Sequence, residues 1–557
     1  GPGELAVPTM SLSGEWANLF KLRVRPALES ALLNYIQQRR WFASKARHVH
    51  SAEILDIIAV PYNAETAYLI PTELEYTDGE PEVYLVPLAF ASEENAAKII
   101  SNSPDAVIAR LKPRGKDTET TSVLYDALSE PDFATALLKS ISQRRQFRGK
   151  NGRVTCFPTR AFRRLRGSAV DSLTPSLSRA EQSNTSVMFG DRFMLKIFRK
   201  MEEGISTELE LGRFLTEKEP FRNTPPVAGA LEYQGKGEVE PVTMGILHGY
   251  VSNEGNAWHY TLDELAHYFE RILAHPEVET PPQLTGPLLE ISEREVPQAL
   301  VETVGSYLAS ARLLGQRTGE LHLALASAMV DVAFTPEPFS VTYQRSLYHT
   351  MRGFAYQVLQ LLGQRRGDLP KDAVPAAEAV LARQDDIISC FQNVTRHKIN
   401  GMRIRCHGDY HLGQVLYTGS DFVIIDFEGE PARHLGERRI KRSPLRDVAG
   451  MLRSFYYAAF VALRNWTTTV PRPEDIPMLE NWTRVWNLWV SGAFLKSYLD
   501  LVSDVPILPS TREDTKTLLN AYLLEKAVYE VNYELNNRPD WVKLPLQGIL
   551  HILDSEV

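Results

Sequence analysis

Two acidic residues and one carboxamide lie at a spacing that suits phosphoryl transfer. Asp409 follows His407-Gly408, Gln414 comes five residues after Asp409, and Asp426 ends an apolar run. In phosphoryl transfer a carboxylate accepts the proton of the attacking hydroxyl, and oxygen ligands hold magnesium against the nucleotide phosphates. We therefore predict Asp409 as the catalytic carboxylate, and Gln414 and Asp426 as ligands of Mg²⁺.

Protein kinases carry these parts in the motifs H-R-D-x-x-x-x-N and D-F-G. Here Gln414 stands in place of the asparagine, and Asp426-Phe427-Glu428 takes the place of the second motif. The apolar runs 415–417 and 422–425, joined by a polar turn, predict a hairpin that returns Gln414 and Asp426 to the same end. Two plainer interpretations stay open, a turn aspartate that caps a backbone amide and a surface hairpin with polar ends.

Three neighbouring residues have several candidate roles. Glu428 could join the metal shell, bind a substrate hydroxyl or form an ion pair with a nearby arginine. His407 and His411 fit the organisation of the loop better than metal binding, because no cysteine accompanies them. His411 is also a candidate contact to the substrate.

A single lysine inside an apolar strand is the second anchor. Residues 193–198 predict a strand, and burying Lys196 there is costly unless its ammonium group is paired. Kinases use such a lysine to contact the nucleotide phosphates and pair it with a helix glutamate. The helix expected after Ser206 offers Glu208 and Glu210, of which we favour Glu210. The alternative is a lysine on an amphipathic edge strand.

The segment before this strand would be the phosphate-binding loop. Residues 181–186 lack the glycines of the G-x-G-x-x-G motif. Ser183, Asn184 and Thr185 could instead donate through hydroxyl groups and backbone amides.

Residues 244–251 would form a hinge whose backbone reads adenine, with His248 and Tyr250 as contacts. The plainer alternative for this segment is a core strand.

A helix near the end of the chain gathers side chains that suit sugar binding. Lys526, Glu530 and Tyr533 recur at i, i+4 and i+7, so they share one helix face. Arg538 and Trp541 follow in the run that ends the helix. Charged groups hydrogen-bond hydroxyls and aromatic faces stack on sugar rings, which makes this face a candidate sugar platform. A solvated helix with i,i+4 pairs is the alternative.

The order of the predicted elements is an α+β module, a β-rich segment and a long helical segment. A proline- and glutamate-rich stretch at 275–297 predicts a solvated insertion or linker. The elements expected in the first part are a helix at 24–38, strands at 54–60, 66–74 and 83–91, and a mostly helical bridge at 123–142.

The composition excludes several classes of function. The 557 residues exceed one typical domain, so we expect two or three. A formal net charge of −8 offers no basic surface for nucleic acid. Three widely spaced cysteines favour a reducing, cytoplasmic location over a disulfide framework or a zinc site. No apolar run is long enough to cross a membrane and no signal peptide is apparent, so no membrane partner is expected.

Taken together, these runs resemble the maltokinases, relatives of the aminoglycoside phosphotransferases. The resemblance rests on residues 40–45 (Arg-Trp-Phe-Ala-Ser-Lys), 182–186, 195–199, 407–414, 426–431, 441–451 and 526–541, and covers nearly the whole chain. It implies an α+β, bilobal, eukaryotic-like kinase fold. The implied parts are an N-terminal cap module at 1–110, a β-rich part of the N-lobe at 111–248 and a mostly helical C-lobe at 249–557.

The resemblance also implies a reaction. It is ATP-dependent phosphorylation of maltose at the anomeric hydroxyl, which gives maltose 1-phosphate for α-glucan synthesis from trehalose. Lys526 and Tyr533 look like the positions that contact the sugar in that family. Such kinases are often fused to trehalose synthase, which is therefore a candidate partner.

Two other functions stay open. An aminosugar or aminoglycoside kinase should have a more acidic pocket, whereas Lys526 and Arg538 favour a neutral sugar. A non-catalytic scaffold that docks trehalose synthase should lack Lys196, Asp409 or Asp426, and all three are present.

Overall fold

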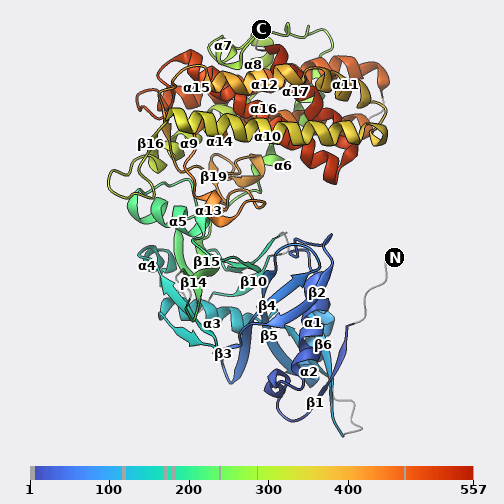
Figure 1. Cartoon of the computed structure of the whole chain (residues 1–557), viewed down its shortest axis with the longest axis vertical. Coiled ribbons are helices and arrows are strands. Elements are labelled where there is room, and N and C mark those ends of the chain that lie inside the picture. The colour runs from blue at the N-terminus through green and yellow to red at the C-terminus, as the bar shows by residue number, and fades with distance from the viewer. Residues whose placement is uncertain are drawn as a thin grey trace. The chain divides into compact units, whose positions relative to one another are not determined.

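The computed structural model describes residues 7–115, 121–168, 173–178, 183–237, 240–284, 286–469 and 472–555. The chain divides into two compact units (Figure 1). Unit 1 comprises Gly1–Lys218 and Pro225–Ser252, and unit 2 comprises Glu219–Thr224 and Asn253–Val557.

The first sheet of unit 1 has the strand order β1-β6-β7-β5-β4-β2, with β3 paired to β4 and β13 paired to β5. Helix α1 (Arg25–Gln37) buries Leu28, Leu32 and Ile36 in the core beside this sheet, which confirms the helix expected there. The strands are β1 (Thr9–Leu12), β2 (Val49–Ile54), β3 (Ile58–Tyr62), β4 (Glu65–Tyr76), β5 (Glu82–Ser92), β6 (Val107–Pro113), β7 (Ser122–Asp126) and β13 (Lys200–Met201).

Two expectations for this region were wrong in detail. The strand expected at 54–60 is the end of β2 and the start of β3. The helical bridge expected from residue 123 begins only at α3 (Pro131–Ser142), because Val123 to Asp126 belong to β7. The helix starts where Pro131 stands at its first position and Glu130 accepts a hydrogen bond from Asp132 N.

The second sheet of unit 1 has the order β10-β11-β12-β15-β14-β9-β8, and its neighbouring strands are antiparallel. The expected hairpin at residues 190–192 is confirmed, since it joins β11 to β12 in the register Ser186↔Lys196. The strands are β8 (Gln146–Arg148), β9 (Gly152–Pro158), β10 (Pro175–Leu177), β11 (Asn184–Phe189), β12 (Phe193–Phe198), β14 (Val227–Gly235) and β15 (Val242–Gly249), and α2 (Glu93–Asn102), α4 (Ala161–Arg166) and α5 (Thr207–Arg213) complete the unit.

The two sheets of unit 1 share one hydrophobic core. Leu85 and Tyr125 of the first sheet belong to the same buried cluster as Leu195, Leu231 and Met244 of the second. The segment before residue 130 therefore folds together with the strands that follow it.

Unit 2 is mostly helical, with α9 beside α15 and α14 beside α16 (Figure 1). Between α12 and α14 the chain forms the turn η8 (Leu412–Gln414) and the hairpin β18 (Val415–Tyr417) and β19 (Phe422–Ile424), as expected. The helices are α6 (Ala257–Ala274), α7 (Leu288–Ser292), α8 (Gln298–Val304), α9 (Tyr307–Leu325), α10 (Val341–Gln364), α11 (Val374–Ala382), α12 (Gln384–Gln392), α13 (Leu435–Arg438), α14 (Leu445–Thr469), α15 (Ile476–Val502), α16 (Arg512–Asn537) and α17 (Lys543–Ser555).

The stretch 275–297, expected to be solvated, is partly buried. Leu289 and Ile291 of α7 lie in the interior, and α7 packs against α15. The apolar side chains of this short helix are therefore buried despite the surrounding prolines and glutamates.

A strand-rich unit and a helical unit confirm the predicted α+β class. Within the described ranges, no helix combines the length and the apolar content needed to cross a membrane.

Candidate active site

Unit 1 holds a buried ion pair on β12, an inner strand of the second sheet. Lys196 is 6% exposed, and its Nζ lies 3.0 Å from Oε2 and 3.2 Å from Oε1 of Glu208. The partner is therefore Glu208, and not Glu210 as the sequence analysis favoured. Successive residues turn by about 100° around a helix, so residues two apart lie on different faces. Ser206 caps α5 by accepting from Leu209 N, and this phase turns Glu208 into the interior.

His248 and Tyr250 lie at the end of β15, which pairs with β12. His248 is buried, and its Nε2 is 3.4 Å from Glu208 Oε1. Its Nδ1 is a buried polar atom without a hydrogen-bond partner among the described residues. Tyr250 is half-buried, and its backbone N donates to Arg192 O. Lys196, Glu208 and His248 thus form one polar cluster inside unit 1.

The candidate phosphate loop lies on the edge of the same hairpin. Ser183 is exposed, whereas Asn184 and Thr185 are half-buried in β11. Residues 181 and 182 of the expected loop lie outside the described residues. Thr185 Oγ1 accepts a hydrogen bond of 2.8 Å from Arg199 Nε.

In unit 2 the loop that carries Asp409 is held by one buried carboxylate. Asp447, in the first turn of α14, accepts from His407 N at 2.8 Å and from Gly408 N at 3.1 Å. Its Oδ2 also lies 2.9 Å from His322 Nε2, and His322 Nδ1 lies 2.7 Å from Tyr498 Oη. Burial opposes ionisation of Asp447, but His322 and the backbone donors lower its pKa below the usual range.

Further bonds fix the rest of the loop. Leu412 N donates to Ser454 Oγ, and Tyr410 Oη bonds Thr318 Oγ1 at 2.7 Å. His407 Nδ1 accepts from Asp409 N, so its Nε2 carries the proton that is donated to Ile425 O at 2.7 Å. The histidine thus organises the loop from inside the protein.

Glycines allow the loop to approach its neighbours closely. Gly408 has a φ of 95°, and a Cβ there would lie 3.1 Å from the Cα of Gly429. Gly450 stands where α14 meets the loop, and a Cβ on it would lie 2.6 Å from Tyr410 O. A side chain at Gly450 would push the loop away from the helix.

The hairpin brings Gln414 and Asp426 to the same end. Ile425 N donates to Gln414 O at 3.0 Å, and Asp426 follows with a φ of 61°. An amide and a carboxylate supply hard oxygen ligands, which fit Mg²⁺ when phosphates and water complete the shell. In the described part of the chain no cluster of three or more histidine, cysteine, aspartate or glutamate side chains has metal-binding geometry.

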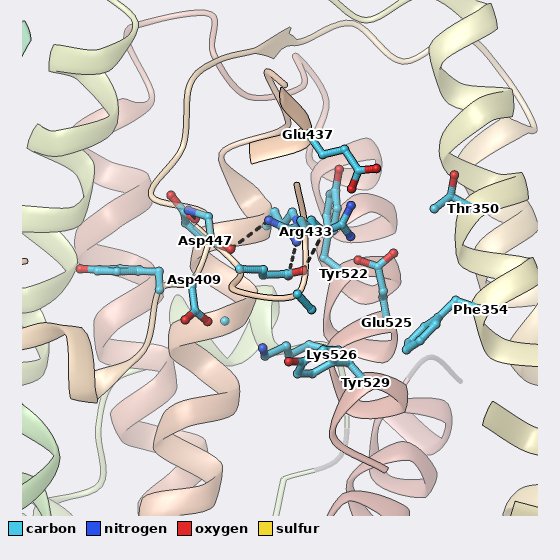
Figure 2. Close-up of a pocket in the computed structure, with 16 residues that line it drawn as sticks. Thr350, Phe354, Asp409, Arg433, Glu437, Asp447, Tyr522, Glu525, Lys526 and Tyr529 are labelled. Carbon is cyan, nitrogen blue, oxygen red and sulfur yellow. Dashed lines mark hydrogen bonds and ion pairs between the residues drawn. The ribbon is translucent and has the colours of Figure 1, made fainter. Parts of the chain in front are cut away.

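A cavity of about 300 Å³ opens beside Asp409 (Figure 2). Figure 2 shows the ammonium group of Lys526 directed towards the Asp409 carboxylate, and Glu525 on the side of the cavity nearer Phe354. The cavity is lined by Thr350, Phe354, Gly408, Asp409, Tyr410, Glu430, Ala432, Arg433, Glu437, Arg446, Asp447, Gly450, Tyr522, Glu525, Lys526 and Tyr529.

The charges around this cavity are unequal. Its lining includes five carboxylates and three cationic side chains. Glu430 is compensated, since it bonds Arg433 Nε at 2.7 Å and also pairs with Arg446. Burial raises the pKa of Glu525, and the positive charge of Arg446 partly offsets this rise.

Asp409 stays ionised in this setting. Burial alone would raise its pKa, but the neighbouring imidazole of His411 and the positive charge of Lys526 lower the pKa of Asp409 to about 2. His411 Nε2 lies 3.8 Å from Asp409 Oδ2, while its Nδ1 accepts from Gly413 N. His411 itself is not among the residues that line the cavity.

The expected sugar platform is only partly assembled. Lys526 lines the cavity, but Glu530 is buried against Arg453, with Nε to Oε1 at 2.7 Å. Tyr533 is 46% exposed and does not line the cavity. Arg453 lies one helical turn after Gly450 in α14, and Glu530 lies one turn after Lys526 in α16. Their ion pair joins the two helices there, so this part of the α16 face does not reach the cavity.

Three more expected contacts lie outside the cavity lining. Arg538 pairs with Glu534 at 3.1 Å, and the guanidinium of Arg464 lies over the Trp541 ring at 4.0 Å. The backbone O of Glu428 accepts from Arg438 at 3.4 Å.

Sequence reasoning missed Asp447, Glu525 and Tyr529. Asp447 stood in the quoted run 441–451, and its place in the first turn of a long apolar helix was the available signal. Glu525 and Tyr529 lie close to Lys526 on α16. Only the rotation of the helix relative to the cavity decides that these two side chains line it and that Glu530 and Tyr533 do not.

Comparisons with known proteins identify one part of the chain. Residues 35–129 match the family described as the maltokinase N-terminal cap domain. This segment contains β2 to β7 and the end of α1, so the cap comprises most of the first sheet.

Curated relatives align with a shorter stretch. A glucosamine kinase of Mycolicibacterium smegmatis is 30% identical over 182 residues, which is 32% of this chain and 42% of that protein. A glucosamine kinase of Streptacidiphilus jiangxiensis is 26% identical over 159 residues, which is 28% of this chain and 32% of that protein. The chain thus spans less than half of the length of either relative.

Solved structures share the whole fold. A glucosamine kinase in complex with glucosamine, ADP and inorganic phosphate superposes with a TM-score of 0.58 at 16% identity, covering 93% of this chain and 98% of that one. A second crystal form of a glucosamine kinase gives a TM-score of 0.57 at 16% identity. The chain therefore has the kinase-like fold of these proteins.

Replacing Asp447 by asparagine should strongly destabilise the protein. The amide loses the charge that His322 and the two loop amides bond, and breaking a buried pair costs about 3–5 kcal/mol. Because the folded pKa is lowered, this stability is present above the unfolded pKa of about 3.9 and is lost as the pH falls through the folded value. Urea denaturation should show a constant difference between wild type and Asp447→Asn at pH 5–8, and a smaller one below about pH 4.

The matched control is Asp386→Asn. Asp386 pairs with Arg383 but its side chain is 58% exposed, so its loss should change stability by less than about 1 kcal/mol. Equal effects of the two substitutions would contradict the role given to Asp447.

Proposed function

We propose that the protein is an ATP-dependent sugar kinase that phosphorylates the anomeric hydroxyl of maltose. The observation that carries this proposal is the ionised Asp409, fixed on a rigid loop beside a cavity of about 300 Å³ that Lys526 and Tyr529 line. Pockets for small molecules measure roughly 300–1,000 Å³. The maltokinase cap at residues 35–129 supports maltose as the acceptor.

In the proposed reaction the anomeric hydroxyl lies against Asp409. The sugar oxygen bonds to the γ-phosphorus of ATP, the bond from that phosphorus to the bridging oxygen breaks, and ADP leaves. The hydroxyl proton passes to the Asp409 carboxylate. A carboxylate with a pKa of about 2 is a weak base, which fits a loose transition state in which orientation of the hydroxyl matters more than early proton removal.

Other residues have supporting roles in this proposal. Lys196, held by Glu208, would bind the nucleotide phosphates, with Ser183, Asn184 and Thr185 as further donors. Gln414 and Asp426 would hold Mg²⁺, which neutralises phosphate charge when bound.

An aminosugar such as glucosamine is the second candidate acceptor. The cavity carries more carboxylates than cations, and Arg538, which had argued for a neutral sugar, is not in its lining. After Glu430 is compensated by two arginines, Glu525 and Glu437 stay available to an ammonium group. The names of the two curated relatives point the same way.

A substrate panel separates these candidates. ADP release should be measured with maltose, glucose and glucosamine, and the phosphorylated position read by NMR. We expect turnover with maltose and a phosphate on its anomeric oxygen. Turnover with glucosamine alone would establish the aminosugar instead. We also propose that the enzyme is cytoplasmic and that it associates with trehalose synthase. Co-purification of the two native proteins tests this association.

Asp409→Asn should strongly reduce turnover and spare nucleotide binding. The asparagine keeps the size of the side chain but loses the charge and the proton acceptor, so the rate should fall by roughly 10²–10⁴-fold. Calorimetric titration with ADP should give a dissociation constant close to that of the wild type. Near-native turnover of this variant would refute the assignment of Asp409.

Glu525→Gln tests what the cavity recognises. If the acceptor carried an ammonium group held by Glu525, loss of a charged hydrogen bond of about 1.5–3 kcal/mol would raise the KM for that sugar more than tenfold. With maltose as the true acceptor we expect a change of less than about threefold in KM. Glu513→Gln, an equal change of charge on an exposed residue of the same helix, is the control.

A further inference from the structure

We propose that two copies of the chain associate through a basic edge of unit 1 and an acidic segment of unit 2. The basic edge is defined by the exposed side chains of Arg148, Lys150, Arg153, Arg163, Arg164 and Arg166. The acidic segment is defined by the exposed side chains of Glu279, Glu290, Glu295 and Glu302. The inference goes beyond the proposed function, because none of these side chains lines the cavity beside Asp409.

Charge is distributed unevenly along the chain. Residues 133–170 contain ten lysines and arginines and no aspartate or glutamate, although the whole chain has a formal net charge of −8. Within the described ranges, the six cations of the basic edge form no ion pair and no side-chain hydrogen bond. Soluble surfaces usually intersperse charges of both signs, so an uncompensated cationic edge favours an anionic partner.

The hairpin of β8 and β9 places two of these cations directly opposite each other. Arg148 is the register partner of Arg153. Gly149 N donates to Gly152 O at 2.7 Å, so the neighbouring pair Arg148–Arg153 is one without backbone hydrogen bonds, in which side chains lie closest. Like charges directly opposite each other on paired strands are destabilising. An anionic surface bound across the hairpin relieves this repulsion.

The basic edge continues along β9 to the next helix. β8 and β9 are the last two strands in the order of the second sheet, and β9 spans seven residues, which is roughly 23 Å. Helix α4 follows β9 and buries Ala161 and Phe162, whereas Arg163, Arg164 and Arg166 are exposed. Cations therefore lie at both ends of an edge that is long enough to meet a second protein.

The acidic segment offers a surface of the opposite charge that is fixed to the core of unit 2. Leu289 and Ile291 of α7 are buried, and α7 packs against α15. Glu290 between them is exposed. Arg512 Nη2 donates to Leu289 O at 3.0 Å, which holds α7 from a second side. The glutamates of this segment are therefore presented by ordered helices and not by a solvated linker.

These glutamates also lack a counter-ion. In the part of the chain that the structure describes, the four glutamates of the acidic segment form no ion pair. Glu302 accepts a hydrogen bond of 3.2 Å from the neutral amide of Gln298. The acidic segment thus has the charge that the basic edge lacks.

The occupant that these charges favour is a second copy, because each copy carries both regions. A two-fold axis between two copies repeats the same contact twice, which closes a dimer. Single-stranded nucleic acid is bound by stacking on exposed aromatic side chains. The exposed large apolar residues in the described part of unit 1 are Val7, Leu22 and Leu177, and none of them is aromatic.

A charge swap in the full chain tests the association by sedimentation velocity over a range of protein concentrations. The edge variant combines Arg148→Glu with Arg153→Glu, and the segment variant combines Glu290→Lys with Glu295→Lys. Each variant alone should raise the dissociation constant of the dimer more than about tenfold, because like charges then face each other across the contact. An equimolar mixture of the two variants should associate again, because the reversed edge of one copy meets the reversed segment of the other.

A single substitution separates association from folding. The edge variant keeps two like charges opposite each other, so its hairpin should be as stable as that of the wild type. Arg148→Glu alone instead creates an opposite-charge pair with Arg153. This variant should melt no lower than the wild type and still weaken the dimer.

The matched controls are Arg110→Glu on β6 and Glu378→Lys on α11, which reverse the charge of exposed residues outside both regions. They should leave the dissociation constant of the dimer unchanged. Raising the salt concentration from 0.1 to 1 M shortens the Debye length from about 10 to about 3 Å, so the wild-type dimer should dissociate.

Three results would overturn the proposal. They are a wild type that sediments as a monomer at every concentration, a mixture of the two variants that stays monomeric, and an equal loss of association in the controls. A monomeric wild type that binds duplex DNA through the basic edge would assign this edge to nucleic acid instead. Failure to phosphorylate any sugar would reject the proposed function and leave the sedimentation result valid.

Discussion

The site in unit 2 depends on one buried carboxylate that bonds main-chain amides. Asp447 accepts from the backbone N–H groups of His407 and Gly408, so it fixes the residues directly before Asp409. A main-chain anchor of this kind sets the direction of the next side chain without touching it. Gly408 at a positive φ and Gly450 in the facing helix allow the close approach that these bonds need. Any change that moves Asp447 must move Asp409.

The parts of the site that the sequence could predict are local in the chain. Two apolar runs joined by a polar turn define β18 and β19, and so bring Gln414 and Asp426 to the same end over twelve residues. The hairpin of Lys196 follows from the same kind of pattern. The anchor of the loop could not be found this way, because Asp447 lies about forty residues from His407 and only the packing of α14 joins them. The choice between Glu208 and Glu210 likewise depends on helix phase, which the cap at Ser206 sets.

The helix α16 shows why a correct periodicity can still misplace a site. Lys526 and Glu530 do share a face, as their spacing predicts. A cavity, however, has a finite length along a helix, and one turn advances about 5.4 Å. One turn after Lys526 the helix face contacts Arg453 instead of the cavity. Glu530 therefore forms a buried ion pair with Arg453. The residues that face the cavity are instead Lys526 and its neighbours Glu525 and Tyr529.

The candidate phosphate loop lacks the glycines of the G-x-G-x-x-G motif, and under the proposed function another feature must take their place. In a glycine-rich loop the backbone itself can approach phosphate closely and present its amides. Residues 183–185 carry side chains instead, so their donors must be held in place from outside. The bond from Arg199 to Thr185, backed by Asp126 and Trp41 of the cap, supplies such a hold. Under the proposed function, side-chain donors that are held from outside the loop replace the backbone amides that a glycine-rich loop presents.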